Sequence, residues 1–598
     1  MTPSPLNVAS HLARMAAAEP DRPALHYPHR GVNPDGHTPY TTLTFAQLDE
    51  LSDRLAYALD CIGIQRGVRT ALMVPPSPDF FALTFALFKV AAVPVLIDPG
   101  MGVKNLGKCL AEAEPEAFIG IAKAHIARRL LGWGKKTIRT TVNAGRRRFF
   151  CHYSLEALKQ PGHTFPQYRI PDVTADETAA ILFTSGSTGV AKGAVYTHGI
   201  FAAQVEMLKQ TYGIEPGEID LCTFPLFALF GPALGMTCVL PDMDPTRPAN
   251  IDPHKAVAQI RQFGVTNMFG SPAVIRRLGD LASGGREPPV HATTRGSRPP
   301  LASLRRVISA GAPASVPAIE RFVQLLPESA QVFTPYGATE ALPVANIGSR
   351  EILAGTRHLT DQGKGVCVGR PVVGMEVRVI PISDDPIPEW DERLCLPAGE
   401  IGEFVVRGSV VTKEYFNRPE ATKRAKIRDP KTGEVLHRMG DVGYLDEQGR
   451  LWFCGRKSHR VVTPHGTLFT DMVEPVFNAL VDGSRRTALV GVTRAGVTYP
   501  VLCVERVDRR KSMYPELTIP FVSWGSVAER LCGDAKRHPH TCIIETFLPY
   551  PGTFPVDIRH NSKIFREKLA VWADKTLGKR WNPGDNSPVL HTGSGATT

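Results

Sequence analysis

The stretch "ILFTSGSTGVAKGAVYTHG", residues 181–199, carries the most information about the fold and function of this chain. Residues 179–183 are apolar and predict a buried strand, which leads into a run of small residues and then into Lys192 beside Gly193. Glycines allow the backbone to approach a ligand closely, hydroxyls donate hydrogen bonds to phosphate oxygens, and a lysine offsets negative charge. We therefore predict a phosphate-binding loop formed by Thr184, Ser185, Gly186, Ser187, Thr188, Gly189 and Lys192.

The order of residues in this loop differs from that of a Walker A loop. Lys192 is followed by Gly193 and a second β-type run, whereas a Walker A lysine is followed by Ser or Thr at the start of a helix. Taken alone, the stretch is also compatible with a Gly- and Ser-rich hairpin that carries an incidental lysine. The rest of the chain has to decide between the two interpretations.

Composition limits the class of protein without selecting a function. A chain of 598 residues exceeds the size at which one hydrophobic core keeps growing, so two or more domains are expected. Its content of 43% hydrophobic and 21% charged residues is typical of a soluble globular protein. The net charge of +11 is compatible with nucleic acid, an anionic membrane surface or nucleotides as partners.

Cysteines and terminal signals indicate a cytoplasmic chain. The eleven cysteines include no CxxC pair, so the sequence predicts neither a zinc site nor a disulfide framework, and a reducing cytosol fits best. Residues 1–20 lack the basic and apolar regions of a signal peptide, and we find no apolar stretch long enough to span a bilayer. We expect a protein that is soluble or peripheral to the inner membrane face.

Strand and helix patterns alternate along the chain. An amphipathic helix in residues 43–63 is followed by the strand "TALMV" (70–74), the helical run 80–92 and the strand "VPVLID" (93–98). This alternation predicts an α/β fold. Residues 121–150 and 282–300 look like insertions, because the first is strongly basic and the second is rich in Gly, Pro and Arg.

Further motifs accompany the loop, in a fixed order. They are "SAGAP" (309–313), "TPYGATE" (334–340), "GEIGEFVVRG" (399–408) with "YFNRPEAT" (415–422), "MGDVGYLDEQGRLWFCGRK" (439–457) and "NSKIFREKL" (561–569). The set resembles the adenylate-forming, AMP-binding superfamily, which includes acyl-CoA synthetases, peptide-synthetase adenylation domains and beetle luciferases. The resemblance implies an enzyme that uses ATP and Mg²⁺ to convert a carboxylate into an acyl-AMP, with release of pyrophosphate.

The resemblance also implies a division of the chain. We expect a large N-terminal AMP-binding domain of mixed β-sheets packed with helices, residues 1–456, and a small mobile C-terminal α/β domain, residues 457–583. Residues 584–598 are expected to be a disordered tail.

Three residues of these motifs correspond to catalytic residues of the superfamily. Thr339 matches the threonine whose hydroxyl reaches the α-phosphate, and Glu340 matches the carboxylate that helps to hold Mg²⁺. Lys563 matches the mobile lysine that neutralises charge during adenylation. Taken singly, Lys563 could equally be a solvated surface charge.

Other residues match the nucleotide-binding positions of the superfamily. The resemblance implies that backbone around two residues of "SAGAP" and the ring of the tyrosine in "TPYGATE" hold adenine, and that an aspartate binds the ribose hydroxyls. Taken singly, that aspartate could be a turn residue. The nucleotide-binding residues are expected to be Gly311, Ala312, Tyr336, Gly337, Asp441 and Arg456.

The chain departs from the acyl-CoA synthetase pattern at several places. It reads "PLFALFGPALG" (225–235), with Ala228 where many acyl-CoA synthetases have histidine. Ser458 stands at the hinge position, usually Asp or Lys, and Asp471 and Ala191 stand at or near family prolines. These changes argue against the domain rotation and pantetheine tunnel used to form a thioester.

Within the superfamily, the pattern most resembles the olefin β-lactone synthetases of bacterial long-chain hydrocarbon biosynthesis. That resemblance implies a 2-alkyl-3-hydroxy fatty acid as substrate, whose 3-hydroxyl attacks the adenylated acyl carbon and expels AMP. An intramolecular hydroxyl gains from proximity, which offsets part of the ring strain. The resemblance also implies the thiolase-like, reductase and lactone-decarboxylase enzymes of the pathway as partners.

The acyl pocket and the base for lactone closure are less well defined. Phe227, Ala228, Leu229 and Phe230 are candidates to line an acyl pocket, and ordinary core packing is an equal alternative. His198 and His459 lie in motif regions, but such histidines are more often structural, so neither is placed among the catalytic residues.

Residues 121–150 contain nine basic residues and no Asp or Glu, mixed with Ile, Leu, Trp and Phe. This composition is typical of peripheral membrane helices, and a solvated helix face with a loop is an equally good interpretation.

Three other functions have to be weighed. A long-chain fatty-acid–CoA ligase would consume CoA, and an acyl-AMP ligase would load a carrier protein. A nucleic-acid-binding protein fits the charge, but the sequence contains no recognised binding module, so no nucleic acid is expected.

Overall fold

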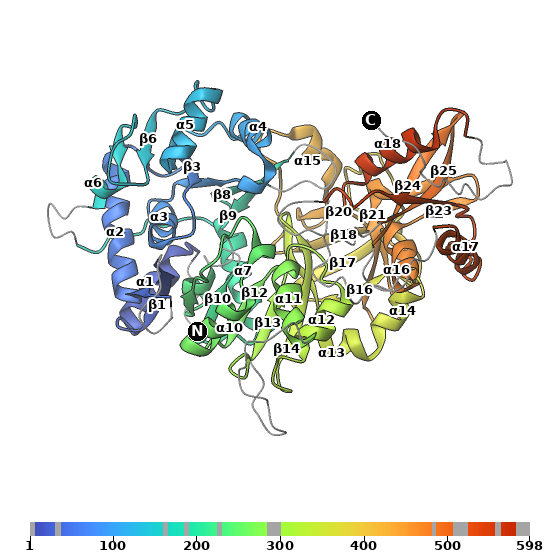
Figure 1. Ribbon diagram of the computed structural model, residues 1–598. Coiled ribbons are helices and arrows are strands. Elements are labelled where there is room, and N and C mark those ends of the chain that lie inside the picture. Colours follow the sequence, from blue (N-terminus) through green and yellow to red (C-terminus); the bar gives the residue numbers. More distant parts are fainter. Residues whose placement is uncertain are drawn as a thin grey trace, which may run out of the picture.

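The computed structural model describes residues 6–29, 38–159, 166–183, 191–223, 230–283, 301–480, 486–505, 524–556 and 564–581 (Figure 1). Within these ranges, no helix combines the length and apolar character needed to cross a bilayer. The α-helices are α1 (Ala9–Ala18), α2 (Phe45–Cys61), α3 (Pro78–Lys89), α4 (Val103–Ala113), α5 (Ala122–Leu131), α6 (Leu155–Lys159), α7 (His198–Tyr212), α9 (Phe230–Ala233), α10 (Pro253–Phe263), α11 (Pro272–Gly279), α12 (Val316–Val323), α13 (Ser349–Glu351), α14 (Arg357–Asp361), α15 (Pro419–Ala425), α16 (Thr470–Leu480), α17 (Trp524–Ala535) and α18 (Arg566–Leu577).

A seven-stranded sheet carries the strand that precedes the predicted phosphate loop. Its pairs are parallel except for β8 and β9, which are antiparallel and lie on either side of residues 184–192. The strands, in spatial order, are β7 (Tyr153–Ser154), β6 (Thr140–Asn143), β5 (Ala117–Gly120), β3 (Arg69–Met73), β4 (Val93–Leu96), β8 (Thr178–Phe183) and β9 (Gly193–Thr197). The predicted strand at residues 179–183 is therefore confirmed as β8.

The predicted helices next to this sheet are also confirmed. Helix α2 begins after Thr44, whose hydroxyl accepts from the backbone of Gln47 while the Gln47 side chain accepts from the Thr44 backbone, a reciprocal capping box. Helix α3 is almost entirely buried, and it packs against α2. Because α3 is apolar on all sides, it occupies the centre of the largest hydrophobic cluster.

A second, larger sheet contains fourteen described strands and forms the wall that carries most of the motifs. Its central strands β10, β12, β13 and β14 pair in parallel, and the antiparallel β14–β15 hairpin leads to a mostly antiparallel half. The order is β17 (Met375–Ile380), β18 (Gly402–Gly408), β20 (Val435–Leu445), β21 (Leu451–Arg456), β16 (Val366–Pro371), β15 (Ala341–Gly348), β14 (Gln331–Ala338), β13 (Arg306–Ser309), β12 (Asn267–Gly270), β10 (Ile219–Cys222), β11 (Thr237–Val239), β1 (Pro23–Pro28) and β2 (Tyr40–Thr44), with β19 (Lys426–Arg428) paired to β20.

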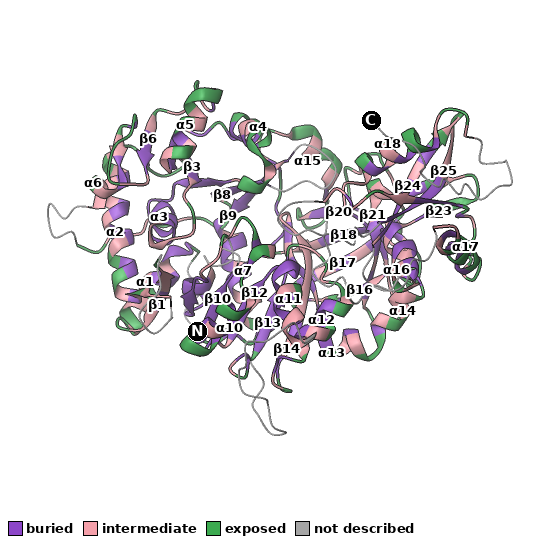
Figure 2. Cartoon of the chain, in the orientation of Figure 1, coloured by how far each residue is buried: buried purple, intermediate pink, exposed green. Residues whose placement is uncertain are grey.

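Residues after Arg456 form two small sheets with a core of their own. Strands β24 (Thr487–Arg494), β25 (Val497–Glu505) and β26 (Thr546–Tyr550) pair in that order, and β22 (Val461–Thr463) pairs with β23 (Gly466–Leu468). Two hydrophobic clusters draw only on residues 461–581. This part lies at the right of Figure 1, and Figure 2 shows buried residues on both its strands and its helices. The α/β class and the mixed sheets packed with helices are confirmed.

Candidate active site

The β14–β15 hairpin positions four of the predicted site residues. Tyr336 and Gly337 lie on β14, and Thr339 and Glu340 form the turn that follows. A Cβ atom at Gly337 would lie 2.6 Å from the Ala341 carbonyl oxygen, so only glycine allows this close pairing of the strands. The motif "TPYGATE" thus has a structural requirement at its glycine as well as polar side chains on either side of it.

Asp441, Arg456 and Tyr336 meet from three different strands. The β20–β21 register places Asp441 opposite Arg456, and Arg456 Nη1 lies 2.7 Å from Asp441 Oδ1. The Tyr336 hydroxyl donates to Asp441 Oδ2 at 2.5 Å. Burial raises the pKa of the Asp441 carboxyl, and Arg456 and the Tyr336 hydrogen bond oppose that rise. Burial and the Asp441 charge raise the pKa of Tyr336 well above its usual value.

Asp441 retains acceptor capacity in this arrangement. Its Oδ1 is buried and accepts no hydrogen bond of good geometry from a described residue, although the Arg456 charge is close. A buried carboxylate oxygen without a donor is costly, and the two hydroxyls of a ribose would supply one. The chemistry of this position therefore fits a nucleotide.

The turn at Thr339 and Glu340 is held by main-chain contacts on both sides. The Tyr196 hydroxyl on β9 donates to the Thr339 carbonyl at 2.5 Å, and the Thr412 N–H donates to the Glu340 carbonyl at 2.9 Å. Glu340 Oε1 accepts a hydrogen bond from the Tyr415 hydroxyl at 2.5 Å. Because both carbonyls are occupied, the side chains of the turn are what it offers to a ligand.

Glu340 is the candidate metal ligand among the described residues. No group of three or more His, Cys, Asp or Glu side chains is arranged to hold a metal ion in the part of the chain that the structure describes. Mg²⁺ commonly takes one or two protein carboxylates and completes its shell with phosphate oxygens and water. A single carboxylate at Glu340 fits a Mg²⁺ ion that arrives with a triphosphate.

Two lysines lie close to the Tyr415 ring. Lys192 Nζ is 4.9 Å and Lys426 Nζ is 5.8 Å from the ring centroid. Lys426 is buried and donates to the Thr412 carbonyl and to the Thr412 hydroxyl, the latter at 3.0 Å. Burial lowers the pKa of Lys426 to about 7, and the nearby Lys192 charge acts in the same direction, against Glu340.

Gly311 and Ala312 directly follow β13, which pairs in parallel with β14, so they lie on the same side of the sheet as the start of "TPYGATE". Gly311 has a φ of 94°, which favours glycine. The structure therefore places these two residues beside the end of β14, which carries Tyr336. Asp441 lies on β20, farther along the same sheet, and contacts Tyr336 through its side chain.

Several predicted site residues lie outside the described residues. These are the loop residues 184–189, the pocket residues Phe227, Ala228 and Leu229, and Lys563. Of the two partly described groups, the structure places Lys192 beside the Glu340 turn and Phe230 at the start of α9.

Phe230 lines an apolar pocket between α7 and the central strands. Its polar members are Gln204 and Tyr212 of α7, and the Tyr212 hydroxyl donates to Asn346 Oδ1 at 3.3 Å. The full lining is Gln204, Leu208, Tyr212, Phe230, Phe269, Ile308, Ala310, Pro335, Leu342 and Pro343. The pocket begins at the strand ends that carry "SAGAP" and "TPYGATE", next to the residues expected to hold the nucleotide.

Gln204 brings an unused acceptor to this apolar wall. Its Nε2 donates to the Leu342 carbonyl at 2.9 Å, which fixes the orientation of the amide. Its Oε1 is buried and has no hydrogen-bond partner among the described residues. The lining is therefore apolar with one such acceptor, which is the chemistry that an alkyl chain carrying a hydroxyl group needs.

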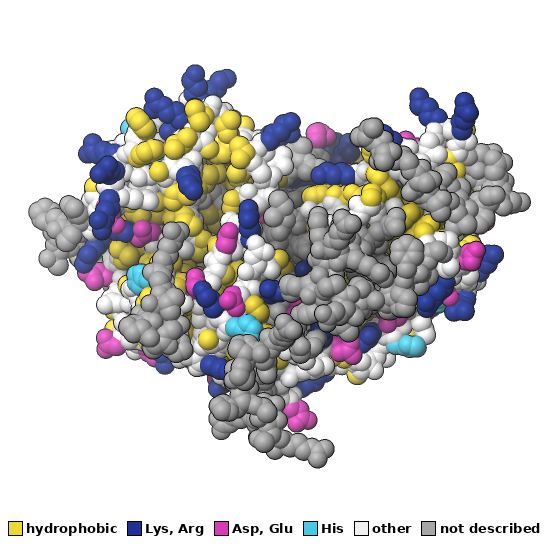
Figure 3. Space-filling model, viewed as in Figure 1, with side chains coloured by type: hydrophobic (Ala, Val, Ile, Leu, Met, Phe, Trp, Pro, Cys, Tyr) yellow, Lys and Arg dark blue, Asp and Glu magenta, His cyan; other side chains and the backbone are white. Residues whose placement is uncertain are grey.

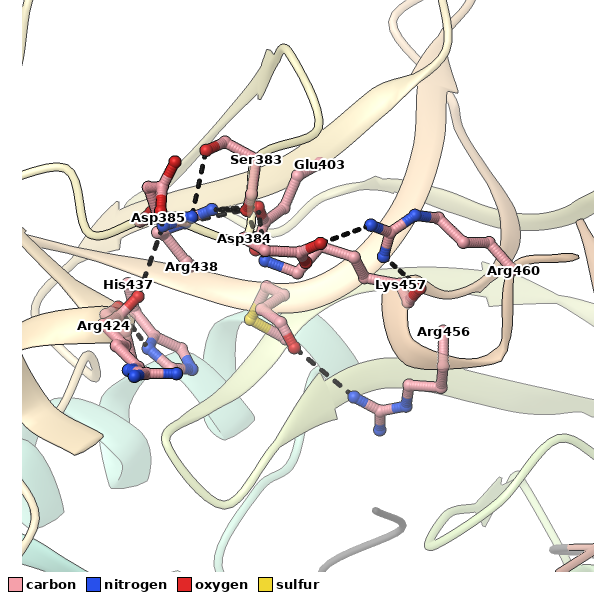
Figure 4. Close-up of polar contacts among 12 residues, drawn as sticks. Ser383, Asp384, Asp385, Glu403, Arg424, His437, Arg438, Arg456, Lys457 and Arg460 are labelled. Carbon is pink, nitrogen blue, oxygen red and sulfur yellow. Dashed lines mark hydrogen bonds and ion pairs between the residues drawn. The ribbon is translucent and has the colours of Figure 1, made fainter. Parts of the chain in front are cut away.

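The segment after Arg456 is anchored to the large sheet (Figure 4). Lys457 Nζ lies 3.0 Å from Glu403 Oε2 and donates to the Ser383 carbonyl at 2.8 Å. Glu403 is almost fully buried and also pairs with Arg438 at 2.6 Å. Ser458, at the expected hinge position, therefore follows directly after a residue whose side chain is fixed to the large sheet.

The two histidines in motif regions are both neutral near pH 7. Burial lowers the pKa of His198 to about 4, and neither of its ring nitrogens has a partner among the described residues. Burial, with the nearby Arg566 and Arg456 charges, lowers the pKa of His459 to about 4. Asp471, another departure from the superfamily pattern, is half-buried in the first turn of α16 and accepts from the Thr470 hydroxyl at 2.8 Å.

Three residues of the site were not predicted from the sequence. Tyr415 opens the quoted motif "YFNRPEAT", which could have pointed to it. Lys426 and Gln204 lie outside the motifs, in helix- and strand-like stretches where a lysine or glutamine is ordinary. Only the fold brings Lys426 within reach of Lys192 and Tyr415.

Comparison with known families and proteins gives consistent results. The family model described as "AMP-binding enzyme" matches residues 12–416. The chain is 49% identical to the olefin beta-lactone synthetase of Stenotrophomonas maltophilia, over 96% of this chain and 99% of that protein. It is likewise 49% identical to that of Xanthomonas campestris pv. campestris, over 95% and 97%. It is 26% identical to a long-chain-fatty-acid–CoA ligase of Salmonella typhimurium, over 75% and 78%.

Solved structures support the fold. ATP-bound MatB from Rhodopseudomonas palustris superimposes with a TM-score of 0.71 at 21% identity, covering 95% of this chain and all of that one (100%). The amide bond synthetase McbA from Marinactinospora thermotolerans gives a TM-score of 0.70 at 20% identity, over 94% and 99%.

Proposed function

Because the chain belongs to the AMP-binding enzyme family, we propose that it activates a 2-alkyl-3-hydroxy long-chain fatty acid with ATP and closes it to a β-lactone, releasing AMP and pyrophosphate. The observation that carries this proposal is the near end-to-end match to two proteins named olefin beta-lactone synthetase. The match to a long-chain-fatty-acid–CoA ligase is weaker in identity and shorter. Thioester formation is therefore the second candidate.

In the first half-reaction, a carboxylate oxygen of the acid attacks the α-phosphorus of ATP, and pyrophosphate leaves. We assign ribose binding to Asp441 and Arg456, because Asp441 Oδ1 accepts no well-aligned hydrogen bond from a described residue and Arg456 lies beside it. Adenine would lie against Tyr336, Gly337 and the backbone of Gly311 and Ala312. The Thr339 hydroxyl would contact the α-phosphate, and Mg²⁺, held by Glu340, would neutralise charge on the triphosphate.

The two lysines beside Tyr415 would bind the same triphosphate that Mg²⁺ binds. Lys426 makes no ion pair among the described residues, and its lowered pKa reflects burial without a contacting carboxylate. A triphosphate beside it would supply the missing negative charge and favour the charged form. We propose that Lys192, residues 184–189 and Lys426 together hold the β- and γ-phosphates, and that Lys563 neutralises charge at the reacting phosphorus.

In the second step, the 3-hydroxyl oxygen attacks the acyl carbon, the hydroxyl loses its proton, and AMP departs with the bonding pair of the acyl–oxygen bond. Closure needs the hydroxyl to lie against the acyl carbon, so a group that orients it should raise the rate. We propose that Gln204 Oε1 accepts the hydroxyl hydrogen while the pocket around Phe230 holds an alkyl chain. An amide is too weak a base to remove the proton, so this role is orientation.

We also propose the two-domain division after Arg456, with Lys563 on the smaller part. The separate clusters in residues 461–581 support it. Enzymes that make the hydroxy acid and consume the lactone are proposed as partners, because the substrate and the strained product must come from and go to other reactions.

The test is to incubate the purified protein with ATP, Mg²⁺ and a synthetic 2-alkyl-3-hydroxy long-chain acid, with and without CoA, and to identify the product by NMR. A β-lactone formed without CoA is expected. A thioester formed only with CoA would overturn the lactone proposal and leave the adenylation step intact. Lys563→Ala should nearly abolish ATP–pyrophosphate exchange, and unchanged exchange would remove Lys563 from the adenylation step.

A further inference from the structure

Helix α5 and the loop after β6 carry apolar side chains on the surface. Leu130 and Leu131 at the end of α5 are 79% and 52% exposed, and Phe150 in the loop is 78% exposed. Ile126 and Phe149 are exposed as well. We call these five residues, with the basic residues among them, the α5 patch.

The two parts of the α5 patch form one surface. The Arg129 guanidinium of α5 lies over the Phe150 ring, 5.5 Å from its centroid, and the Phe149 and Phe150 centroids are 5.3 Å apart. Figure 3 shows hydrophobic side chains with Lys and Arg among them at the upper left, where Figure 1 places α5 and β6. The patch is therefore a mixed apolar and cationic face.

The conformation of the loop after β6 holds Phe149 and Phe150 at the surface. Phe149 and Phe150 have φ values of 46° and 60°, a left-handed conformation that bulky residues rarely adopt. The Asn143 side chain donates to the Arg147 carbonyl at 2.7 Å, and the Cys151 N–H donates to the Arg148 carbonyl at 3.0 Å. Because these bonds close the loop, the exposure of Phe150 is a property of an ordered turn.

The exposed side of helix α5 carries more apolar side chains than is usual for a helix that faces only water. On its inner side, His125 is buried and forms a hydrogen bond with the Val142 carbonyl at 3.0 Å, and the Arg128 guanidinium lies over the Phe118 ring. Its outer side exposes Ile126 and Leu130 beside Arg129. A helix that faces only water carries polar side chains on that side, whereas interfacial helices combine apolar and cationic ones.

The charge on this segment is all of one sign. Residues 121–150 contain nine Lys and Arg and no Asp or Glu, and Lys123, Lys135, Lys136, Arg139 and Arg146–Arg148 are exposed. Such a surface is complementary to anionic lipid headgroups, while the apolar side chains can enter the acyl boundary. We propose that the α5 patch docks the protein onto an anionic membrane surface. If the proposed function holds, this would bring the enzyme to the phase in which a long-chain acid dissolves.

The test is sedimentation of the full-length protein with vesicles, without ATP or acid. We expect binding about tenfold stronger to vesicles containing phosphatidylglycerol than to phosphatidylcholine alone, weakening with added salt. Leu130→Ser with Phe150→Ser should remove most of the binding, and Arg146→Gln with Arg147→Gln and Arg148→Gln should remove the preference for anionic lipid. Val571→Ser, which changes an exposed valine on α18, is the matched control and should bind as the wild type does.

ATP–pyrophosphate exchange in solution with a short soluble acid should be unchanged in these variants, which shows that they are folded. Equal binding to neutral and anionic vesicles, or patch variants that bind like the wild type, would overturn the proposal. So would a wild-type protein that ignores vesicles but self-associates through the patch, as seen by light scattering. Vesicle binding and lactone synthesis are measured separately, so either proposal can fail without the other.

Discussion

Two buried lysines, Lys89 and Lys426, differ in whether the protein provides a carboxylate to pair with their charge. Lys89 on α3 is fully buried, and its Nζ contacts Asp49 at 2.6 Å as well as Asp53, both on α2. Lys426 on β19 is also buried, but its contacts are the neutral carbonyl and hydroxyl of Thr412. The first cation is neutralised by the protein, and the second depends on a charge from outside.

This difference assigns a structural role to Lys89 and a ligand-binding role to Lys426. An ion pair closed within the fold fixes α2 against α3 and has no capacity for a ligand. A buried cation without a carboxylate weakens the fold and gains when an anion binds beside it. The predictions below test this separation.

Lys89→Met should have the largest effect, on stability. Removing the lysine leaves two carboxylates buried without a counter-charge, so the free energy of unfolding should fall by about 3–5 kcal/mol, measured in urea. Adding Asp49→Asn and Asp53→Asn to this variant should restore much of that loss. Activity per folded molecule should stay unchanged, and a selective fall in ATP affinity would break the comparison.

Lys426→Met should have the opposite profile. We expect kcat/KM for ATP to fall about 100-fold, which corresponds to about 2.7 kcal/mol, because a cation beside the triphosphate is lost. The free energy of unfolding should not fall, since the removed charge had no carboxylate partner. Lys413→Met, on the exposed ion pair with Asp176, is the matched control and should change neither quantity much. An unchanged KM for ATP would remove Lys426 from the site.

The pH dependence of ATP binding should sharpen the same point. Burial lowers the pKa of Lys426 to about 7 in the free protein, and bound triphosphate should raise it, so above pH 7 binding takes up a proton. ATP affinity should therefore fall as pH rises through 7, by up to about tenfold per pH unit, and Lys426→Met should flatten this slope. Binding would be followed by calorimetry in two buffers of different ionisation enthalpy. A slope that survives in the variant would contradict the assignment.

Gln204→Leu should have the smallest effect, on substrate choice. Gln204 Oε1 is a neutral counterpart of Lys426, a buried group without a partner in the described part of the chain. The variant should lose about tenfold of the preference for a 3-hydroxy acid over the same acid without the hydroxyl, measured as a ratio of kcat/KM values. Leu208→Met, in the same pocket, should keep that preference. Equal loss for both acids would indicate a packing defect instead.

Short-range patterns predicted the framework of the site. The apolar run before the loop became β8, and the motifs singled out Tyr336, Asp441 and Arg456, whose side chains the structure brings into contact. Each of these residues sits in a stretch whose order along the chain is itself informative. The α/β fold followed from alternating strand and helix periods, which depend only on neighbours in the sequence.

Contacts between distant segments could not be predicted in this way. Lys426 and Lys192 are separated by more than two hundred residues and both lie close to the Tyr415 ring. The proposed role of Lys426 depends on its direct contacts being with Thr412, since no described carboxylate pairs with it. The orientation of the Gln204 amide depends on the carbonyl of Leu342. Such features depend on which sheet edges the fold brings together, and no local pattern encodes them.

The turn at Thr339 and Glu340 has one more consequence. Its carbonyls are tied to Tyr196 on the seven-stranded sheet and to the Thr412 amide beyond β18 on the large sheet. The turn thus links the two sheets by hydrogen bonds. A ligand that binds the Glu340 carboxylate and restrains this turn should therefore also restrain both sheets. Binding of the nucleotide should therefore slow the hydrogen exchange of the amides of β9 and of residue 412 to a similar extent.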